Sequence, residues 1–231
     1  MTSLFIWATL LAWMMQVPTT HVIPAASSAS ATSCIDELCG TDASSGYPVD
    51  ANFTWVNQGT ATKTATSTYV ILQDVDAGGD QLRMRVLSAP ATPYTVTLAF
   101  NVNGVGGSTA GYSAGFVGRQ SGDGKAYIIG CATATNVQYL AVQKFSSSSA
   151  WNSNVSFINN SGVGLRGKNV WVRYTDDGTN RRAWSSADGV VFNPIISTEG
   201  RTTYLTIDQV GFYLDAHDSN ASMVVRYFKV E

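Results

Sequence analysis

The sequence carries few charges. Lysine, arginine, aspartate and glutamate together make up 13% of its 231 residues, and the formal net charge is −2. Proteins that bind nucleic acids or anionic membranes need clustered lysine and arginine to neutralise phosphates. Neither nucleic acid nor an anionic membrane surface is therefore an expected partner. The hydrophobic share of 45% is ordinary for a globular protein, so disorder throughout the chain is excluded.

Cysteine and histidine are scarce as well, at three and two residues. Cys34 and Cys39 are near enough in sequence to form a disulfide, which would leave Cys131 single. Alternatively all three thiols are free, with Cys131 a small apolar residue of a strand. A zinc site needs about four cysteine or histidine ligands, and the only histidines are His21 and His217. Zinc chemistry is therefore not expected.

The sequence does have an uncharged apolar segment at its amino terminus, "MTSLFIWATLLAWMMQV", which ends before Pro18. One hypothesis is an anchor that is covered by a neighbouring subunit, because an apolar segment in water needs a cover. The anchor residues would be Leu4, Phe5, Ile6, Trp7, Leu10, Leu11 and Trp13.

Two alternatives to the anchor stay open. The segment can be a secretory signal peptide, because Ala29 and Ala31 form an A-x-A cleavage pattern after it, although no lysine or arginine precedes the apolar run. A transmembrane helix is the weaker alternative, since about 14 apolar residues fall short of the roughly 20 that span a bilayer. Residues 24–50, rich in alanine, serine, threonine and glycine, are typical of a linker. We therefore expect an arm and linker over residues 1–51 and one domain over residues 52–231.

The rest of the chain is typical of an all-β protein. Short runs rich in valine, isoleucine, threonine and aromatic residues alternate with glycine, aspartate, asparagine and serine, and no helical period of apolar residues is visible. Thirteen short strands at this spacing predict a two-sheet antiparallel sandwich of the jelly-roll type. The predicted strands are 53–57, 68–74, 81–87, 94–101, 114–118, 126–131, 139–144, 155–157, 169–174, 181–185, 190–192, 205–213 and 223–230.

The stretch "WVRYTDDGTNRRAWSSADGVVF", residues 171–192, predicts strands joined by tight turns. Val172 and Tyr174 should point to one side of a strand, and Trp171 and Arg173 to the other. Asp177–Gly178 and Asp188–Gly189 suit turns that need a positive φ. Arg173 is expected to lie over a neighbouring aromatic ring or to pair with a hairpin aspartate.

This stretch resembles the concanavalin A-like lectin/glucanase superfamily, in its laminin-G-like branch. The resemblance rests on Trp-x-Arg, a glycine turn, an aromatic strand, and Ser-x-Asp-Gly followed by an aromatic residue. Those positions are Trp171, Arg173, Asp177, Gly178, Trp184, Ser186, Asp188, Gly189 and Phe192. The later "IDQVGFYLDAHDSNASMVVRYFKV" is similar to the closing strands of the family, so the resemblance covers about residues 52–231. It implies a fold and leaves function open, because this fold hosts enzymes, lectins and structural domains.

Glucanases of the superfamily carry two glutamates on one strand, in a Glu-x-Asp-x-Glu pattern that turns both carboxylates toward one sugar. This chain has three glutamates, Glu37, Glu199 and Glu231, and none belongs to such a pattern. Asp177 and Asp188 are at predicted turns. The sequence therefore predicts a protein without enzymatic activity and without a catalytic residue.

Calcium is the one cofactor that the sequence leaves possible. Two stretches cluster hard oxygen ligands of the kind that calcium prefers, "DVDAGGD" and "DAHDSN". The alternative for both is a strand followed by an Asp/Gly turn. The calcium candidates are Asp74, Asp76, Asp80, Asp215 and Asp218.

A sugar-binding site without catalysis combines an exposed aromatic ring with polar groups that form hydrogen bonds. Trp151 is the first candidate, because it is a single tryptophan in the polar run "SSSSAWNSN". Trp184, Tyr112 and Asn180 are further candidates. For each of these residues the alternative is packing in the core or between subunits.

Taken together, the sequence predicts a non-enzymatic structural or surface module of a larger assembly. A bacteriophage-like virion is the expected location, with other virion subunits and further copies of the chain as partners and with glycan binding as an added role. The first alternative is a secreted carbohydrate-binding domain that loses its first 31 residues. The second alternative is a divergent glycoside hydrolase.

Overall fold

The computed structural model describes residues 46–75, 78–105, 111–134, 137–159 and 168–231. The chain divides into two compact units, Met1–Ile35 and Asp36–Glu231, and every described residue belongs to the second unit. The predicted anchor, Cys34, Cys39 and Asp76 lie outside the described residues. No helix in the described part is long and apolar enough to cross a membrane.

The described residues form one short 3-10 helix, Asp50–Asn52, and fourteen strands. The strands are β1 (Thr54–Val56), β2 (Thr62–Ala65), β3 (Val70–Asp74), β4 (Arg83–Ser88), β5 (Tyr94–Val105), β6 (Ser113–Arg119), β7 (Ala126–Ala134), β8 (Val137–Ser147), β9 (Ala150–Asn159), β10 (Val170–Asp176), β11 (Asn180–Ser186), β12 (Asn193–Gly200), β13 (Gln209–Asp215) and β14 (Asn220–Val230).

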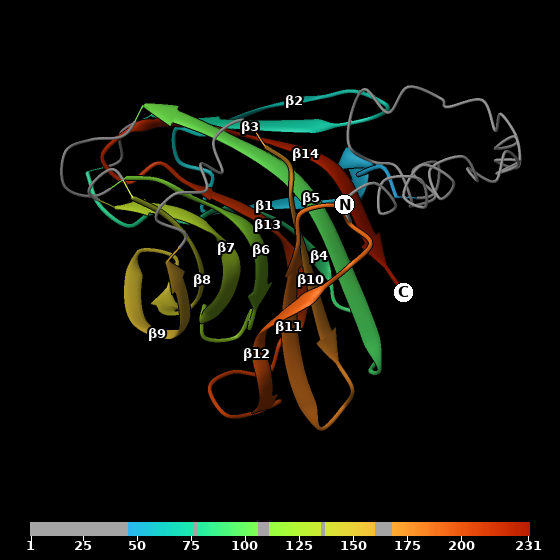
Figure 1. The fold of residues 1–231 in the computed structure, drawn as a ribbon. Helices are drawn as coiled ribbons and strands as arrows, with labels where there is room; N and C mark the ends of the chain where they lie inside the picture. The colour runs from blue at the N-terminus through green and yellow to red at the C-terminus, as the bar shows by residue number, and fades with distance from the viewer. Residues whose placement is uncertain (1–45, 76–77, 106–110, 135–136, 160–167) are drawn as a thin grey trace, which may run out of the picture. The chain divides into compact units, whose positions relative to one another are not determined.

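The strands build two seven-stranded antiparallel sheets, which confirms the predicted all-β sandwich (Figure 1). The first sheet has the order β1-β4-β13-β6-β7-β8-β9, and the second has the order β12-β11-β10-β5-β14-β3-β2. Strands that are far apart in sequence are paired in both sheets, such as β4 with β13 and β5 with β14. Strands from distant parts of the domain therefore become neighbours only when the sheets form.

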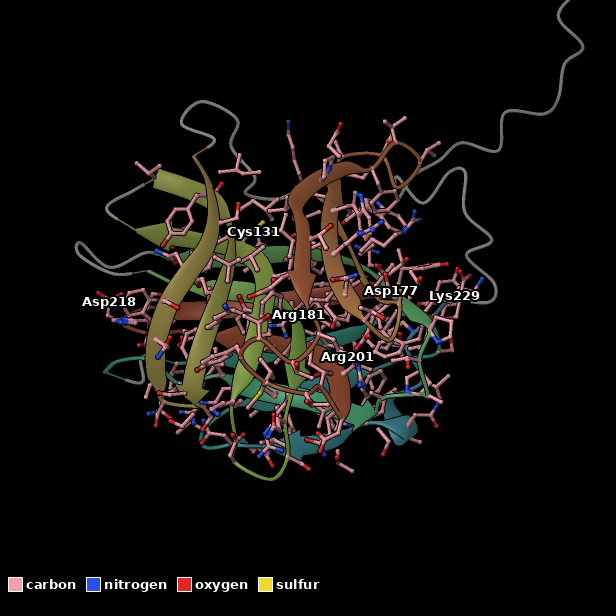
Figure 2. All side chains as sticks on the ribbon, turned by 90° about the horizontal axis from the view of Figure 1, so that it is seen from below. Cys131, Asp177, Arg181, Arg201, Asp218 and Lys229 are labelled. Atoms are coloured by element: carbon pink, nitrogen blue, oxygen red, sulfur yellow. The ribbon has the colours of Figure 1, made fainter. Side chains whose placement is uncertain are left out.

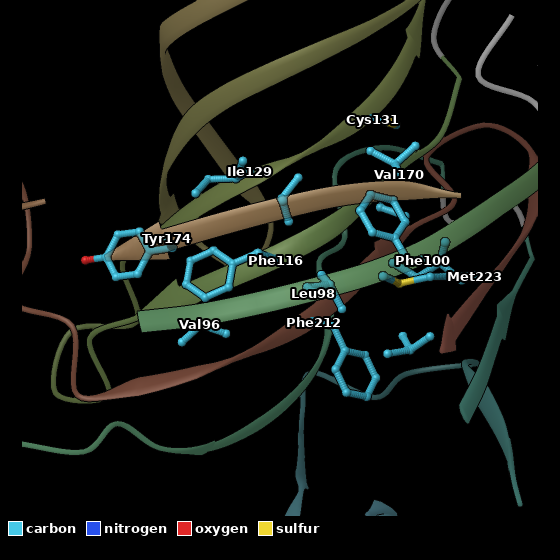
Figure 3. Packing of buried hydrophobic residues seen from close by; sticks show 14 of the residues in the cluster. Val96, Leu98, Phe100, Phe116, Ile129, Cys131, Val170, Tyr174, Phe212 and Met223 are labelled. Atoms are coloured by element: carbon cyan, nitrogen blue, oxygen red, sulfur yellow. The ribbon is translucent and has the colours of Figure 1, made fainter. Parts of the chain in front are cut away.

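One apolar core fills the space between the sheets. In β5 the alternate residues Val96, Leu98 and Phe100 point into this core, as the alternation in the sequence predicts. Phe116 and Phe212 meet them from the first sheet, and Phe116 stacks on Tyr174 of β10 with ring centroids 4.9 Å apart (Figure 3). Cys131 is buried in the same core as a free thiol, in accord with its expected place in a strand.

The side-chain directions predicted for residues 170–174 are confirmed. Val172 and Tyr174 lie in the core, whereas Trp171 is buried on the opposite face of the second sheet against Tyr227. The guanidinium carbon of Arg173 lies 3.7 Å from the centroid of the Phe192 ring.

The two predicted turns of this stretch are confirmed as well. Gly178 and Gly189 have φ values of +93° and +74°. Asp177 Oδ1 accepts the backbone N–H groups of Thr179 and Asn180, so the first turn is held by a side chain of its own.

Two strand predictions need correction, and one strand was missed. Residues Val190–Phe192 are not a strand, because Asp188 Oδ1 accepts the N–H groups of Val190 and Val191 and so removes those donors from any ladder. The strand comes directly afterwards, as β12. The exposed strand β2 was not predicted, and the strand expected over residues 205–213 is β13, over Gln209–Asp215.

The first sheet also buries apolar side chains on its outer face, which points away from the second sheet. Leu82, Met84, Val117, Tyr213 and Phe145 form this outer cluster with their neighbours. The turn between β8 and β9 folds back over it, and the N–H of Leu82 donates to the carbonyl oxygen of Ser148 at 2.7 Å. The curved strands β6, β7 and β8 are visible in Figure 1. The sheet is therefore rolled, with a concave outer face.

Candidate functional site: a cleft on the first sheet

A cleft of about 190 Å³ lies beside the outer cluster of the first sheet. It is smaller than the roughly 300–1,000 Å³ of pockets for drug-sized ligands, so it suits one ring or the end of a chain. Its walls come from β6, β7, β8, β9, β13 and the turns next to them. The lining residues are Asp80, Gly111, Tyr112, Ser113, Ala132, Thr133, Tyr139, Gln143, Phe145, Trp151, Asp215 and His217.

Trp151 supplies the exposed aromatic ring of the cleft, with 48% of its surface accessible. It stands opposite Phe145 in the β8–β9 ladder, where the register shifts between Lys144 and Phe145 and again between Phe145 and Ser147. Such irregularities break strand alternation and redirect side chains. Phe145 is therefore buried in the outer cluster, while Trp151 remains exposed to solvent.

Asp215, at the end of β13, is a buried carboxylate in the wall of the cleft. It is 3% exposed, and its Oδ1 accepts the N–H groups of Gln81 at 3.2 Å and His217 at 3.0 Å. Burial raises the pKa of Asp215 to about 6, and the nearby charge of Asp80 adds to the rise, while the two N–H groups oppose it. Asp215 can therefore change its charge close to neutral pH.

His217 lies between two further carboxylates at the same end of the sheet. Its Nε2 is 3.8 Å from Asp80 Oδ1, and its Nδ1 is 3.8 Å from Asp218 Oδ1. These side chains are about one third exposed, at 32% for His217 and 33% for Asp80. The cleft thus offers an imidazole, carboxylates and the amide of Gln143 as polar contacts beside the rings of Trp151 and Tyr139.

The structure brings only part of the predicted sugar contacts together. Trp151 lines the cleft with its ring exposed. Tyr112 borders the cleft, but it is 2% exposed and its ring packs in the core against Gly104, so it presents no face to a ligand. Trp184 and Asn180 belong to β11 in the second sheet, and neither lines the cleft.

The predicted calcium ligands are likewise divided. Asp74 is buried, and its carboxylate accepts hydrogen bonds from Thr60 Oγ1 at 2.6 Å and Arg83 Nε at 2.9 Å, so both oxygens are already used. Asp80 and Asp215 line the cleft, and Asp218 lies beside them. Among the residues that the structure describes, no group of three histidine, cysteine or acidic side chains could hold a metal ion.

Sequence reasoning missed Tyr139, Gln143 and His217 as residues of the cleft. Tyr139 and Gln143 lie in a strand that was predicted, and the alternation within it could have placed both on the face opposite Leu140 and Val142. For His217 the signal was its place within "DAHDSN", between two of the proposed calcium ligands.

A larger cavity of about 530 Å³ lies on the second sheet. Its described lining includes hydroxyl and amide side chains such as Thr62, Gln73 and Asn103, but no aromatic ring. The cleft on the first sheet is therefore the better candidate for a functional site, because it combines aromatic and polar groups.

No model of a known protein family matches the chain, and no curated protein sequence matches it. Similar solved structures do exist. A protein of unknown function from Saccharomyces cerevisiae has a TM-score of 0.56 at 16% identity, over 78% of this chain and 96% of that chain. The GH43 protein BlXynB from Bacillus licheniformis has a TM-score of 0.50 at 13% identity, over 70% of this chain and 32% of that chain. This chain therefore spans about a third of the length of BlXynB.

At 16% and 13% identity, the likeness to these two solved structures is a likeness of fold and goes no further. The exoplasmic/lumenal domain of VIP36, in its Ca2+/Man-bound form, has a TM-score of 0.47 at 13% identity, over 75% of this chain and 82% of that chain.

Proposed function

We propose that this protein is a non-enzymatic surface module that binds carbohydrate in the cleft of the first sheet. The observation that carries the proposal is the exposed ring of Trp151 in a cleft with polar walls. The apolar face of a sugar packs on an aromatic ring, while its hydroxyl groups exchange hydrogen bonds with carboxylate, amide and imidazole groups. Trp151, Asp80, Gln143 and His217 supply those two kinds of contact in one place.

A glycan array probed with the full chain, followed by calorimetry on the glycans it retains, tests this proposal. Trp151→Ala should weaken binding about tenfold or more, since a loss of about 1.4 kcal/mol corresponds to a factor of ten. Trp184→Ala is the matched control, because Trp184 is partly buried on the other sheet. Equal binding by the wild type and Trp151→Ala would contradict the proposal, as would an array without any bound glycan.

Glycoside hydrolysis is a second candidate function, and one observation favours it. Asp80 and Asp215 line the same cleft, and the raised pKa of Asp215 suits a group that gives up a proton near neutral pH. Glu199, one of the three glutamates of the chain, does not line the cleft and is paired with Lys144 and Arg181. Sugar release from a bound glycan, abolished in both Asp80→Asn and Asp215→Asn, would replace the binding proposal with this one.

The larger role that we propose is display on an assembly of the virion type, with residues 1–51 as the anchor to neighbouring subunits or further copies of the chain. Its support is the uncharged apolar run near the amino terminus, in a chain that otherwise has the composition of an exposed β-sandwich. Mass spectrometry of the mature protein tests it. A mature chain that starts near Thr32 would favour the secreted alternative.

A further inference from the structure

A fully buried arginine lies between the sheets, whereas the cleft lies on the outer face of the first sheet. Arg181, in β11, is 0% exposed, and Figure 2 shows it among the strands, near Arg201. Its Nε donates to Glu199 Oε2 at 3.0 Å, and its guanidinium carbon lies 4.4 Å from the centroid of the Tyr127 ring. The ladder fixes this place, because Arg181 pairs with Asp176 and Asp176 pairs with Tyr94 at the first residue of β5.

Positive charge exceeds negative charge around Arg181. Lys144 Nζ donates to the other oxygen of Glu199 at 2.6 Å, so two cations share one carboxylate. The nearby carboxylate of Asp176 is already used, because its Oδ2 accepts from Arg201 Nε at 2.8 Å and its Oδ1 from the N–H of Gly178 at 3.0 Å. A buried charge without a partner is strongly unfavourable.

The terminal nitrogens of this arginine also lack hydrogen-bond partners. Within the described part of the chain, neither Arg181 Nη1 nor Nη2 has a partner. The Tyr94 hydroxyl lies close to that of Tyr174 and the Tyr127 hydroxyl close to Glu199, but none of the three makes a hydrogen bond of normal geometry. The three rings are close together, with centroid distances of 6.1 Å from Tyr94 to Tyr174 and 6.4 Å from Tyr127 to Tyr174. Buried polar groups are nearly always paired, and a guanidinium group can only donate.

What these groups require is an acceptor that carries negative charge. We propose that Arg181 Nη1 and Nη2, with the hydroxyl groups of Tyr94, Tyr127 and Tyr174, bind a small monovalent anion of the size of chloride. The charge of the ion follows from the surplus of one cation over Glu199. Its small size follows from the burial of all four side chains, each 4% exposed or less. Lys144, Glu199 and Arg201 are partly exposed, so the site lies near solvent.

Thermal unfolding in mixtures of sodium chloride and sodium gluconate at constant ionic strength tests the site. Chloride that binds the folded state should raise the Tm by about 3 to 5 °C for each tenfold increase above its dissociation constant. The double variant Tyr94→Phe/Tyr174→Phe keeps both rings in the core but removes two donors, so this dependence should flatten. Tyr213→Phe is the matched control, since Tyr213 is equally buried but belongs to the outer cluster.

Crystals grown in sodium bromide give a direct view of the same site. The expected result is an anomalous peak within hydrogen-bond distance of Arg181 Nη1 or Nη2. A water molecule there, together with equal Tm values in chloride and gluconate, would overturn the proposal. A dependence on chloride that persists in the double variant would overturn it as well. Glycan binding at the cleft, on the outer face of the first sheet, should be the same in the wild type and in Tyr94→Phe/Tyr174→Phe.

Discussion

Asp215 is a single residue whose chemistry is set by burial. Its pKa rises from 3.8 to about 6, so between those values the folded protein binds a proton that the unfolded chain releases. The stability contributed by this group is complete below pH 4 and is lost as the pH rises through 6. Asp215→Asn has no carboxyl proton to lose. Its free energy of unfolding, relative to that of the wild type, should therefore increase by about 2 to 3 kcal/mol as the pH rises from 4 to 8. Urea denaturation of both proteins at several pH values measures the difference.

The neighbouring carboxylate supplies a check on that prediction. The charge of Asp80 is one cause of the raised pKa of Asp215. An NMR titration of the Asp215 carboxyl carbon should therefore give a lower midpoint in Asp80→Asn than in wild type. An unchanged midpoint would mean that burial alone produces the shift. A wild-type midpoint near 4 would contradict the buried environment itself.

The predicted contact residues differ in how far their surroundings could be predicted from the sequence. Trp151 could be predicted as an exposed aromatic ring because its polar neighbours give it no apolar stripe to join. Tyr112 and Asp74 have equally suggestive neighbours, yet their environments are made by residues distant in sequence. The ring of Tyr112 fills the space beside Gly104, and the carboxylate of Asp74 meets Arg83 and Thr60. No local pattern reveals such partners.

At the scale of elements, the turns before and after β11 give a testable contrast between two glycines. Gly189 and Gly178 both have positive φ, so alanine costs about 1 to 2 kcal/mol at either position. A Cβ on Gly189 would also lie 2.7 Å from the ring of the fully buried Trp171, whereas on Gly178 the nearest atom is Thr92 Oγ1 at 3.3 Å.

Gly189→Ala should therefore lower the free energy of unfolding by about 1 to 3 kcal/mol more than Gly178→Ala does, because it adds overpacking to backbone strain. Chemical denaturation of the two variants and the wild type gives both values. Equal losses would mean that the loop at residues 187–192 moves away from Trp171 without cost.

The elements that could be predicted are those in which a single physical signal dominates. The alternation in β5 and the Asp-Gly turns around β11 belong to this class. Strand β2 was not predicted because all four of its residues are exposed, so buried and exposed positions do not alternate. The register shifts in the β8–β9 ladder were not predicted for another reason. They occur where the hairpin bends over the outer cluster, and the alternation of residues in the sequence does not indicate that bend.

At the scale of the whole molecule, the two candidate sites depend on pairing between distant strands. Asp215 and Ser113 stand next to each other in the β13–β6 ladder, and Trp151 and Asp80 approach them only because the first sheet is rolled. Between the sheets, Arg181, Tyr94 and Tyr127 come from three strands of two sheets. The sequence therefore predicts the sandwich but neither site, because each site exists only after long-range pairing.

A single core shared by both sheets also predicts that they unfold together. The reactivity of Cys131 can be used to detect this unfolding. Burial raises the pKa of its thiol to about 12, so roughly one molecule in ten thousand carries the reactive thiolate at pH 8. In a Cys34→Ser/Cys39→Ser variant, alkylation at pH 8 should begin only at the denaturant concentration where the far-UV circular dichroism changes. The triple variant that also carries Cys131→Ser supplies the blank. Alkylation well before that change would show that β7 opens while the second sheet is still folded, and the sandwich would then be two units instead of one.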